Sequence, residues 1–529
     1  MSAGNHAAAA GTSPDAPEGR TYGIPDSIKP SEFNGDVRNL PQARPVELHK
    51  WNELEGPENR KSKPAKTPAE AAPILLAPMP SPTQNFAGIS FSDAVTGGQA
   101  GAGWPPDVNG DVGPNHYIES VNDTYAIYSK TGTLLAAFTE NSLWSGAATG
   151  TPCDANNQGD PVVLHDGLVD RWILTNFAFA VSAGNPVAPF YQCFAVSKTS
   201  DPVSGGWWRY AVRMDPGGTG LPPNGKLNDY PKFGLWTDCL YMASNEFTMP
   251  AGTFAGTAYA SFSRTAMYAG TALSASNSSL GYTASTTTPF TMIPSNLLGT
   301  SAGSLPPAGT PNYFVSESTT AFNFEVRKFT PGAGCGSGGT LGAPTTVSQS
   351  SYNGSGTGVP QPGTTNTLDT LFDRLMQKVQ YRKVGAAESL WVVHDSQASG
   401  ATNRPQWAQI NVTGATVSAA PVQQQIFAPD TTLHRWMASV AVDGQGNMAM
   451  GYSLGNATTF PSIYYAGRLV GDALNQLPQT EVALIAGGGS QTNNCGSAAC
   501  TRWGDYTAMS VDPSDDCTFW YINEYYDTP

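Results

Sequence analysis

The feature of this sequence that most constrains its fold is a segment that occurs twice, far apart in the chain. Segment 238–247 begins with Asp-Cys and ends with Asn-Glu and an aromatic residue, and segment 516–525 repeats this order. An Asp-Tyr pair precedes each copy, at 229–230 and at 505–506. A shared strand–turn–strand unit at such a distance indicates a repeat architecture.

The composition indicates which repeat architectures are compatible with the chain. The sequence contains 57 glycines and 42 prolines, and only 13% of its residues are charged, compared with about 25% in typical globular domains. Short aromatic and β-branched runs alternate with turn residues, and helical periodicity is almost absent. This pattern predicts a sandwich, a barrel or a propeller, and the duplicated segment favours the propeller.

Blocks made of a turn followed by an apolar strand recur from about residue 85 to the C-terminus. Their intervals are longer than the 40–50 residues of compact propeller blades. We therefore predict an all-β fold with a single β-propeller of seven blades, or of six if the weakly matching block near 311 is not counted. The blocks open at 105–107, 159–161, 228–230, 311–313, 372–374, 434–436 and 503–505.

The two ends of the chain differ from this repeating part. Residues 1–83 are polar and proline-rich, which predicts a disordered N-terminal arm. Residues 84–529 are predicted to form the propeller. Because the final block contains only two strands, we expect a strand near 85–92 to close the ring and cover its exposed edge.

The charge of the chain limits its partners. The formal net charge is −14, and an acidic domain without Lys/Arg runs repels nucleic acid and anionic lipid. No stretch approaches the roughly 20 apolar residues that a membrane span requires. A polysaccharide or glycoconjugate is the expected partner, and a monomer is the expected assembly.

The seven cysteines indicate an oxidising compartment. They form no CxxC pair and no zinc-like spacing with histidine, so disulfides in a secreted protein, extracellular or periplasmic, fit better. Cys153 and Cys193 could join neighbouring strands, and 495–500 could close a small loop. Cys239 and Cys517 occupy the same position in the repeat, and we expect two separate disulfides or two buried thiols there.

Two patterns resemble known proteins. The turn at 197–208, with its Ser, Asp, Gly and Trp residues, resembles the Asp-box of sialidases and related propellers, which is a structural hairpin. The motifs at 159–161, 228–231, 435–437 and 502–506 are similar to those of a group of secreted bacterial β-propeller proteins. This second resemblance implies a fold and a compartment, but no chemistry.

The block openings carry the candidate catalytic residues, because the first strand of each propeller blade starts near the central axis. Carboxyl groups that share one cavity perturb one another, which can place an acid beside a base, as glycoside hydrolysis requires. The alternative is that these residues pair with one another or cap hairpins, as structural devices that repeat often do. The candidates are Asp160, Asp229, Asp373 and Asp505, with Glu246 and Glu524 in reserve.

Arginines and aromatic residues at the same openings are candidates for substrate binding. Guanidinium groups match carboxylates, and aromatic faces stack on sugar rings, although large aromatic residues also fill the space between blades. The candidates are Arg374, Arg435, Arg502, Tyr230, Tyr506, Trp436 and Trp503.

One short segment has the alternating oxygen ligands of a calcium loop. It contains Asp107, Asn109 and Asp111, but the distal glutamate of such loops is replaced by Ile118. The two alternatives are a structural Ca²⁺ ion and a metal-free Asp-Asn-Gly turn. No other cofactor is expected.

The leading functional hypothesis is a secreted, carbohydrate-active propeller that acts as a glycoside hydrolase through paired carboxylates in its central cleft. The expected convergence of charged residues favours this hypothesis. The alternative is a non-catalytic cell-surface propeller that binds glycan or protein, which the long and uneven insertions between repeats favour.

Overall fold

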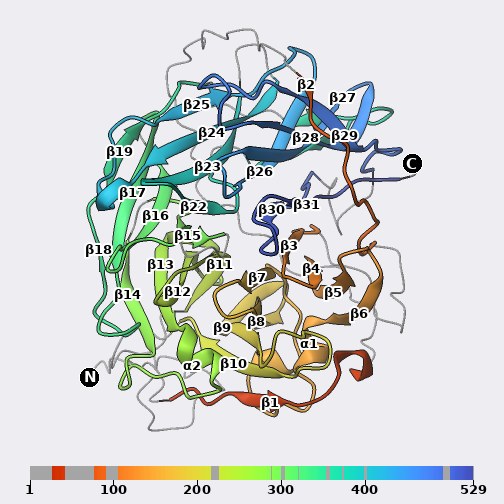
Figure 1. Cartoon of the computed structure of the whole chain (residues 1–529). Coiled ribbons are helices and arrows are strands. Elements are labelled where there is room, and N and C mark those ends of the chain that lie inside the picture. Colours follow the sequence, from red (N-terminus) through yellow and green to blue (C-terminus); the bar gives the residue numbers. More distant parts are fainter. Residues whose placement is uncertain are drawn as a thin grey trace, which may run out of the picture.

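The protein is built from β-sheets arranged around a common centre (Figure 1). The computed structural model describes residues 27–41, 77–90, 105–215, 225–286, 289–298, 304–319, 321–352, 358–371, 374–397, 402–492 and 501–527. The described α-helices are α1 (Glu140–Leu143) and α2 (Arg264–Tyr268). No helix in these ranges has the length and apolarity that crossing a membrane requires. The fold is therefore all-β, with the sheet arrangement of a propeller.

The first half of the chain contributes three sheets whose strands follow sequence order. The first contains β3 (Asn109–Val112), β4 (His116–Val121), β5 (Thr124–Ser129) and β6 (Leu134–Thr139). The second contains β7 (Val162–Asp166), β8 (Arg171–Ser182), β9 (Asn185–Ser197) and β10 (Trp207–Arg213). The third contains β11 (Lys226–Leu235), β12 (Cys239–Thr248), β13 (Thr253–Ser263) and β14 (Leu280–Thr286).

The second half continues the pattern, with one junction between sheets. Strand β15 (Ile293–Leu297) pairs antiparallel with β16 (Asn312–Glu317) and parallel with β22 (Val379–Val384), which joins two sheets into one. The other strands of this joined sheet are β17 (Asn323–Thr330), β18 (Thr340–Leu341), β19 (Thr345–Ser348), β23 (Ala387–Gln397), β24 (Asn403–Asn411) and β25 (Gln423–Ile426). The next sheet contains β26 (His434–Val442), β27 (Met448–Asn456), β28 (Thr459–Arg468) and β29 (Gln479–Ile485). Two separate hairpins are also formed, β20 (Val359–Pro360) with β21 (Thr367–Leu368) and β30 (Ala508–Val511) with β31 (Phe519–Ile522).

The first strands of successive sheets surround one axis. Strand β3 contacts β7, and contacts continue from β7 to β11, β15, β22, β26 and β30, which contacts β3 again. The chain of contacts therefore closes on itself. The block predicted to open at 311–313 is displaced, because its residues begin β16, the second strand. The first strand there is β15, whose short apolar run is a weak signal in the sequence.

A residue with a left-handed backbone lies before or within each of these strands: Tyr230 and Met437 lie inside β11 and β26, and the other five precede their strands. Such a backbone conformation is uncommon outside glycine, so its recurrence at equivalent places indicates a repeated structural device. The residues are Asp107 (φ +44°), Asp160 (+49°), Tyr230 (+52°), Thr291 (+54°), Leu371 (+45°), Met437 (+51°) and Gly504 (+41°).

Part of the N-terminal region packs on the outside of the sheets, contrary to the expectation of a disordered arm over residues 1–83. Strand β1 (Ser31–Phe33) pairs with β10, and β2 (Ala77–Pro78) pairs with β29. Val37 is 1% exposed and packs in the same apolar cluster as Trp207. Burial of such side chains stabilises each by about 1.5–3 kcal/mol, which orders residues 27–41.

The strand expected near 85–92 is not formed by residues 85–90, and residues 91–92 lie outside the described part of the chain. Instead, Phe86 packs between Tyr128 of β5 and Trp520 of β31, with ring centroids 5.2 and 6.4 Å away. The backbone N–H of Ile89 donates to Glu119 Oε1 at 2.5 Å. The segment therefore bridges the first and last sheets by side-chain contacts.

Two disulfides are formed within the described ranges. Cys153 pairs with Cys193, as predicted, and Cys239 pairs with Cys335, which lies in the turn between β17 and β18. Cys517 is a free, exposed thiol, so the expectation of a second disulfide or a buried thiol at this repeat position is wrong. The pair expected within 495–500 lies outside the described residues.

Candidate functional site

A buried lysine lies among the block openings that the sequence analysis singled out. Lys232 of β11 is 1% exposed, and its Nζ has no hydrogen-bond partner in the described ranges. It sits 3.4 Å from the ring centroid of Tyr230 and 3.9 Å from that of Tyr506. A β-bulge between Asp229 and Lys232 re-aims the side chains at this point. Burial lowers the pKa of Lys232 to about 8, while Asp160 and Asp505 oppose this shift.

Asp160 lies beside this lysine and connects two sheets. It precedes β7 and is 8% exposed, and its Oδ2 accepts the backbone N–H of Tyr230 at 2.9 Å. Burial raises the pKa of Asp160 to about 6, although the positive charge of Lys232 acts in the opposite direction. Asp160 is therefore a carboxyl group that can hold a proton in mildly acidic solution.

Asp505 occupies a different environment in the same cluster. Its carboxylate forms an ion pair with Arg502, whose Nε donates to Oδ1 at 3.1 Å. Its backbone N–H donates to Asp107 Oδ1 at 3.2 Å, and its carbonyl accepts the Tyr230 hydroxyl at 3.1 Å. Unlike Asp160, Asp505 has a direct cationic partner.

The structure thus brings together several residues that the sequence analysis predicted to converge, around a lysine that it did not name. Asp229 immediately precedes Tyr230, is half-buried, and acts electrostatically on Lys232. Asp373 lies outside the described residues. The members of this axial cluster are Asp160, Tyr230, Lys232, Arg502, Asp505 and Tyr506.

The two reserve glutamates differ. Glu246 is paired with Lys226 of the neighbouring strand, with Nζ to Oε2 at 2.8 Å. The carboxyl group of Glu524 is buried, and burial, with a further contribution from Asp505, raises its pKa well above the ordinary value. The charge of Asp505, a member of the axial cluster, therefore acts on the ionisation of Glu524, whereas Glu246 forms an ion pair between strands.

Five of the predicted substrate-binding residues are part of the protein interior, and among them Tyr230 is 3% and Tyr506 0% exposed. Arg435 is fully buried and paired with Asp430 and Glu481 at 2.6 Å each. Trp436 and Trp503 are each 0% exposed and pack together with centroids 5.9 Å apart. Because these side chains present no surface, the prediction that they contact a sugar is wrong.

The oxygen atoms of the predicted calcium loop accept protein donors. Asn109 Oδ1 accepts the N–H of Val163 at 2.9 Å, and Asp111 Oδ2 accepts the N–H of His165 at 3.0 Å. Asp111 also lies 3.2 Å from Lys378 Nζ. Within the described ranges, no group of three His, Cys, Asp or Glu residues is arranged to hold a metal ion. Calcium binding at Asp107, Asn109 and Asp111 stays a prediction.

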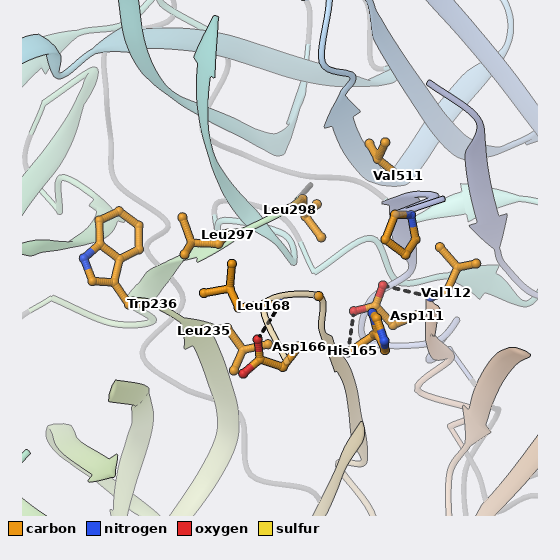
Figure 2. Close-up of a pocket in the computed structure, with 12 residues that line it drawn as sticks. Asp111, Val112, His165, Asp166, Leu168, Leu235, Trp236, Leu297, Leu298 and Val511 are labelled. Carbon is orange, nitrogen blue, oxygen red and sulfur yellow. Dashed lines mark hydrogen bonds between the residues drawn. The ribbon is translucent and has the colours of Figure 1, made fainter. Parts of the chain in front are cut away.

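A small cavity lies at the other end of the first strands (Figure 2). Its volume of about 20 Å³ is room for little more than one water molecule. Asp166 on its wall is engaged by Arg264 and by the hydroxyl of Tyr268, and Asp111 is engaged as described above. This cavity is too small for a sugar.

Sequence reasoning missed Lys232 and Asp395. Asp395 of β23 is fully buried, accepts the N–H of Met437 at 2.9 Å, and has its pKa raised by burial to about 8. Neither residue stands out in its strand, because β11 also contains Lys226 and Asp229 and β23 also contains Glu388 and His394. The sequence therefore carried no signal that singles them out.

Comparisons with known proteins do not place the chain in a family. No protein-family model and no curated protein matches it. Among solved structures, a DUF4623 family protein from Bacteroides eggerthii is 9% identical, with 66% of this chain and 68% of that chain covered and a TM-score of 0.32.

Two solved arabinofuranosidases give similar results. An α-L-arabinofuranosidase from Fusarium graminearum, solved with an iminosugar inhibitor, is 10% identical over 69% of this chain and 94% of that chain, with a TM-score of 0.32. An α-L-arabinofuranosidase from Lactobacillus brevis is 12% identical over 66% of this chain and 94% of that chain, with a TM-score of 0.28. Likeness at this level carries no argument about the present chain.

Proposed function

We propose that the protein is a glycoside hydrolase whose reaction takes place at the axial cluster. The observation that carries this proposal is that two carboxyl groups, Asp160 and Asp505, flank Lys232 in unequal environments. Glycosidases need one carboxyl group that holds a proton and a second that is ionised. Unequal surroundings are the physical means of separating these two roles.

The contacts assign a role to each carboxyl group. Asp160, with a pKa raised to about 6 by burial, is the general acid that protonates the departing glycosidic oxygen. Asp505, in its ion pair with Arg502, is the carboxylate that acts as base or nucleophile. Lys232 limits the rise in the pKa of Asp160, which keeps this group able to give up its proton.

A non-catalytic, glycan-binding propeller is the second candidate, and one observation favours it. The oxygens of Asp160 and Asp107 accept backbone N–H groups of neighbouring sheets. Asn245 and Asp395 do the same at two other openings. This equivalence is what a purely structural device would produce.

A hydrolysis screen separates the two candidates. Purified protein is incubated at pH 5.5 with a panel of polysaccharides, and newly formed reducing ends are measured for the wild type and for Asp160→Asn and Asp505→Asn. Loss of a general acid or base lowers the rate by about 10²–10⁴-fold. Asp472→Asn, in the turn after β28, is the control and keeps full activity. The hydrolase proposal is wrong if both test variants cleave as fast as the wild type, and glycan binding without cleavage favours the second candidate.

We infer that the propeller has seven blades, of which the last is an incomplete blade formed by β30 and β31. The closed series of contacts between first strands supports this number.

The two disulfides support secretion into an oxidising compartment. We also propose that the protein is a monomer, and size-exclusion chromatography with light scattering tests this assembly state.

A further inference from the structure

One arginine at the edge of the axial cluster differs from the other arginines at the block openings. Arg374 is half-buried, and its Cζ lies 5.4 Å from the ring centroid of Tyr230 and 4.9 Å from that of Phe290. Its Nε is buried and has no hydrogen-bond partner in the described ranges. No salt bridge joins Arg374 to a described residue.

The other cations at the openings are already engaged or enclosed. Arg435 is held by two carboxylates, and Arg502 is held by Asp505. Lys232 is enclosed by two tyrosine rings and also lacks a hydrogen-bond partner. A buried guanidinium Nε without a partner is unusual, because such donors normally find carboxylate or carbonyl oxygens.

The position of Arg374 relates it to the proposed reaction centre. Tyr230 is contacted on its ring by both Arg374 and Lys232, donates its N–H to Asp160, and donates its hydroxyl to the carbonyl of Asp505. Arg374 therefore contacts the ring of the same tyrosine whose backbone N–H donates to the carboxylate of Asp160 and whose hydroxyl donates to the backbone carbonyl of Asp505. A sugar ring that reaches the carboxyl groups can place a substituent at the guanidinium.

We propose that Arg374 is a specificity-determining residue that binds the carboxylate of an acidic sugar, so that the substrate is a uronic-acid-containing polysaccharide. The planar fork of arginine matches a carboxylate better than it matches neutral hydroxyl groups. Asp505 and Asp160 do not compete for Arg374, because Asp505 binds Arg502 and Asp160 accepts an N–H while facing Lys232. This inference rests on the proposed function for its substrate class.

Binding measurements test the inference without requiring catalysis. Trigalacturonate and the matched neutral trisaccharide, galactotriose, are titrated into the full chain by calorimetry at low temperature. Arg374→Met removes the charge and keeps much of the apolar stem, and Arg374→Lys keeps a charge without the fork. Arg171→Met is the matched control, because Arg171 donates to backbone carbonyls of its own turn.

We expect the wild type to bind trigalacturonate more tightly than galactotriose. Arg374→Met weakens trigalacturonate binding by about 10- to 100-fold, the range for a lost charged hydrogen bond, and leaves galactotriose binding unchanged. Arg374→Lys shows an intermediate loss, and Arg171→Met shows none. Raising the salt concentration from 20 to 200 mM weakens only trigalacturonate binding.

Equal binding of the two sugars by the wild type, or undiminished trigalacturonate binding by Arg374→Met, overturns the inference. If Arg374→Met does not fold, the comparison of Arg374→Lys with the wild type decides in the same way. Cleavage of a neutral glycan with no binding of trigalacturonate sinks the inference and leaves the hydrolase proposal standing. Arg374-dependent binding of trigalacturonate with no cleavage of any glycan supports the role of Arg374 and overturns the hydrolase proposal.

Discussion

Replacing Asp160 by asparagine changes how the stability of the protein depends on pH. Asparagine has the same shape, and its Oδ1 can still accept the N–H of Tyr230, but it does not titrate. Burial raises the folded-state pKa of Asp160 from 3.8 to about 6. At about 1.36 kcal/mol for each pH unit, this difference corresponds to about 3 kcal/mol.

The sign follows from linkage. Because the folded state holds the proton of Asp160 more tightly, this group favours folding fully below about pH 3.8. The contribution is lost as the pH rises through 6. The free energy of unfolding of Asp160→Asn, relative to that of the wild type, therefore rises by about 2–3 kcal/mol between pH 4 and pH 7. Lys232 does not reverse this sign, because a lysine with a pKa of about 8 keeps its proton between pH 4 and pH 7.

Urea denaturation followed by tryptophan fluorescence at pH 4 and pH 7 measures both free energies, provided that the m-values of the two proteins agree. Asp472→Asn is the control, since Asp472 caps an exposed turn by accepting the N–H of Leu469 at 2.7 Å. A difference between wild type and Asp160→Asn that stays constant within about 0.5 kcal/mol over this range would show that Asp160 is solvated. In that case the raised pKa that supports the role of Asp160 as general acid is absent.

Three further changes test the scaffold, each by urea denaturation at pH 7. Cys239→Ser opens the disulfide to Cys335, which spans 96 residues, and we expect a loss of about 2–5 kcal/mol. An equal effect of reducing agent on wild type and variant would contradict this. Arg435→Met leaves two carboxylates without their buried partner and costs about 3–5 kcal/mol; a cost below about 1 kcal/mol would mean that the site is hydrated. Gly234→Ala places a Cβ 2.3 Å from a backbone oxygen of β15 and costs about 1–3 kcal/mol, whereas Gly471→Ala, with open space around it, stays within about 0.5 kcal/mol.

The sequence predicted the all-β repeat because turn signals and alternation are local properties. It also predicted that Asp160 and Asp505 share one site, since equivalent positions in a ring converge. It could not predict Lys232, whose orientation depends on the bulge between Asp229 and Lys232. Nor could it separate Trp503, which is fully buried, from an aromatic residue exposed to a ligand, because both occur beside turns.

The described residues 27–41 differ from the prediction of a disordered arm for another reason. Composition indicates whether a segment can form a core of its own, but not whether it can add to an existing sheet. Strand β1 pairs with β10 and Val37 enters a cluster formed by the neighbouring sheets. A short polar segment is thus ordered by surfaces that are distant in sequence, and no local pattern reveals them.

The duplicated segment shows how the same sequence motif acquires different roles at two places in the ring. In the first copy, Asn245 lies within the long strand β12, and its Oδ1 accepts the N–H of Thr291, before the first strand of the next sheet, at 2.9 Å. In the second copy, Asn523 follows the short β31 and donates instead to Ser453 Oγ of the preceding sheet at 2.9 Å. The described part of the last sheet has only two strands, so no outer strand covers Cys517, which is exposed. The motif therefore specifies the hairpin in both copies. The neighbouring sheets decide whether its cysteine forms a disulfide or stays a free thiol. They also decide whether its asparagine contacts the next sheet or the preceding one.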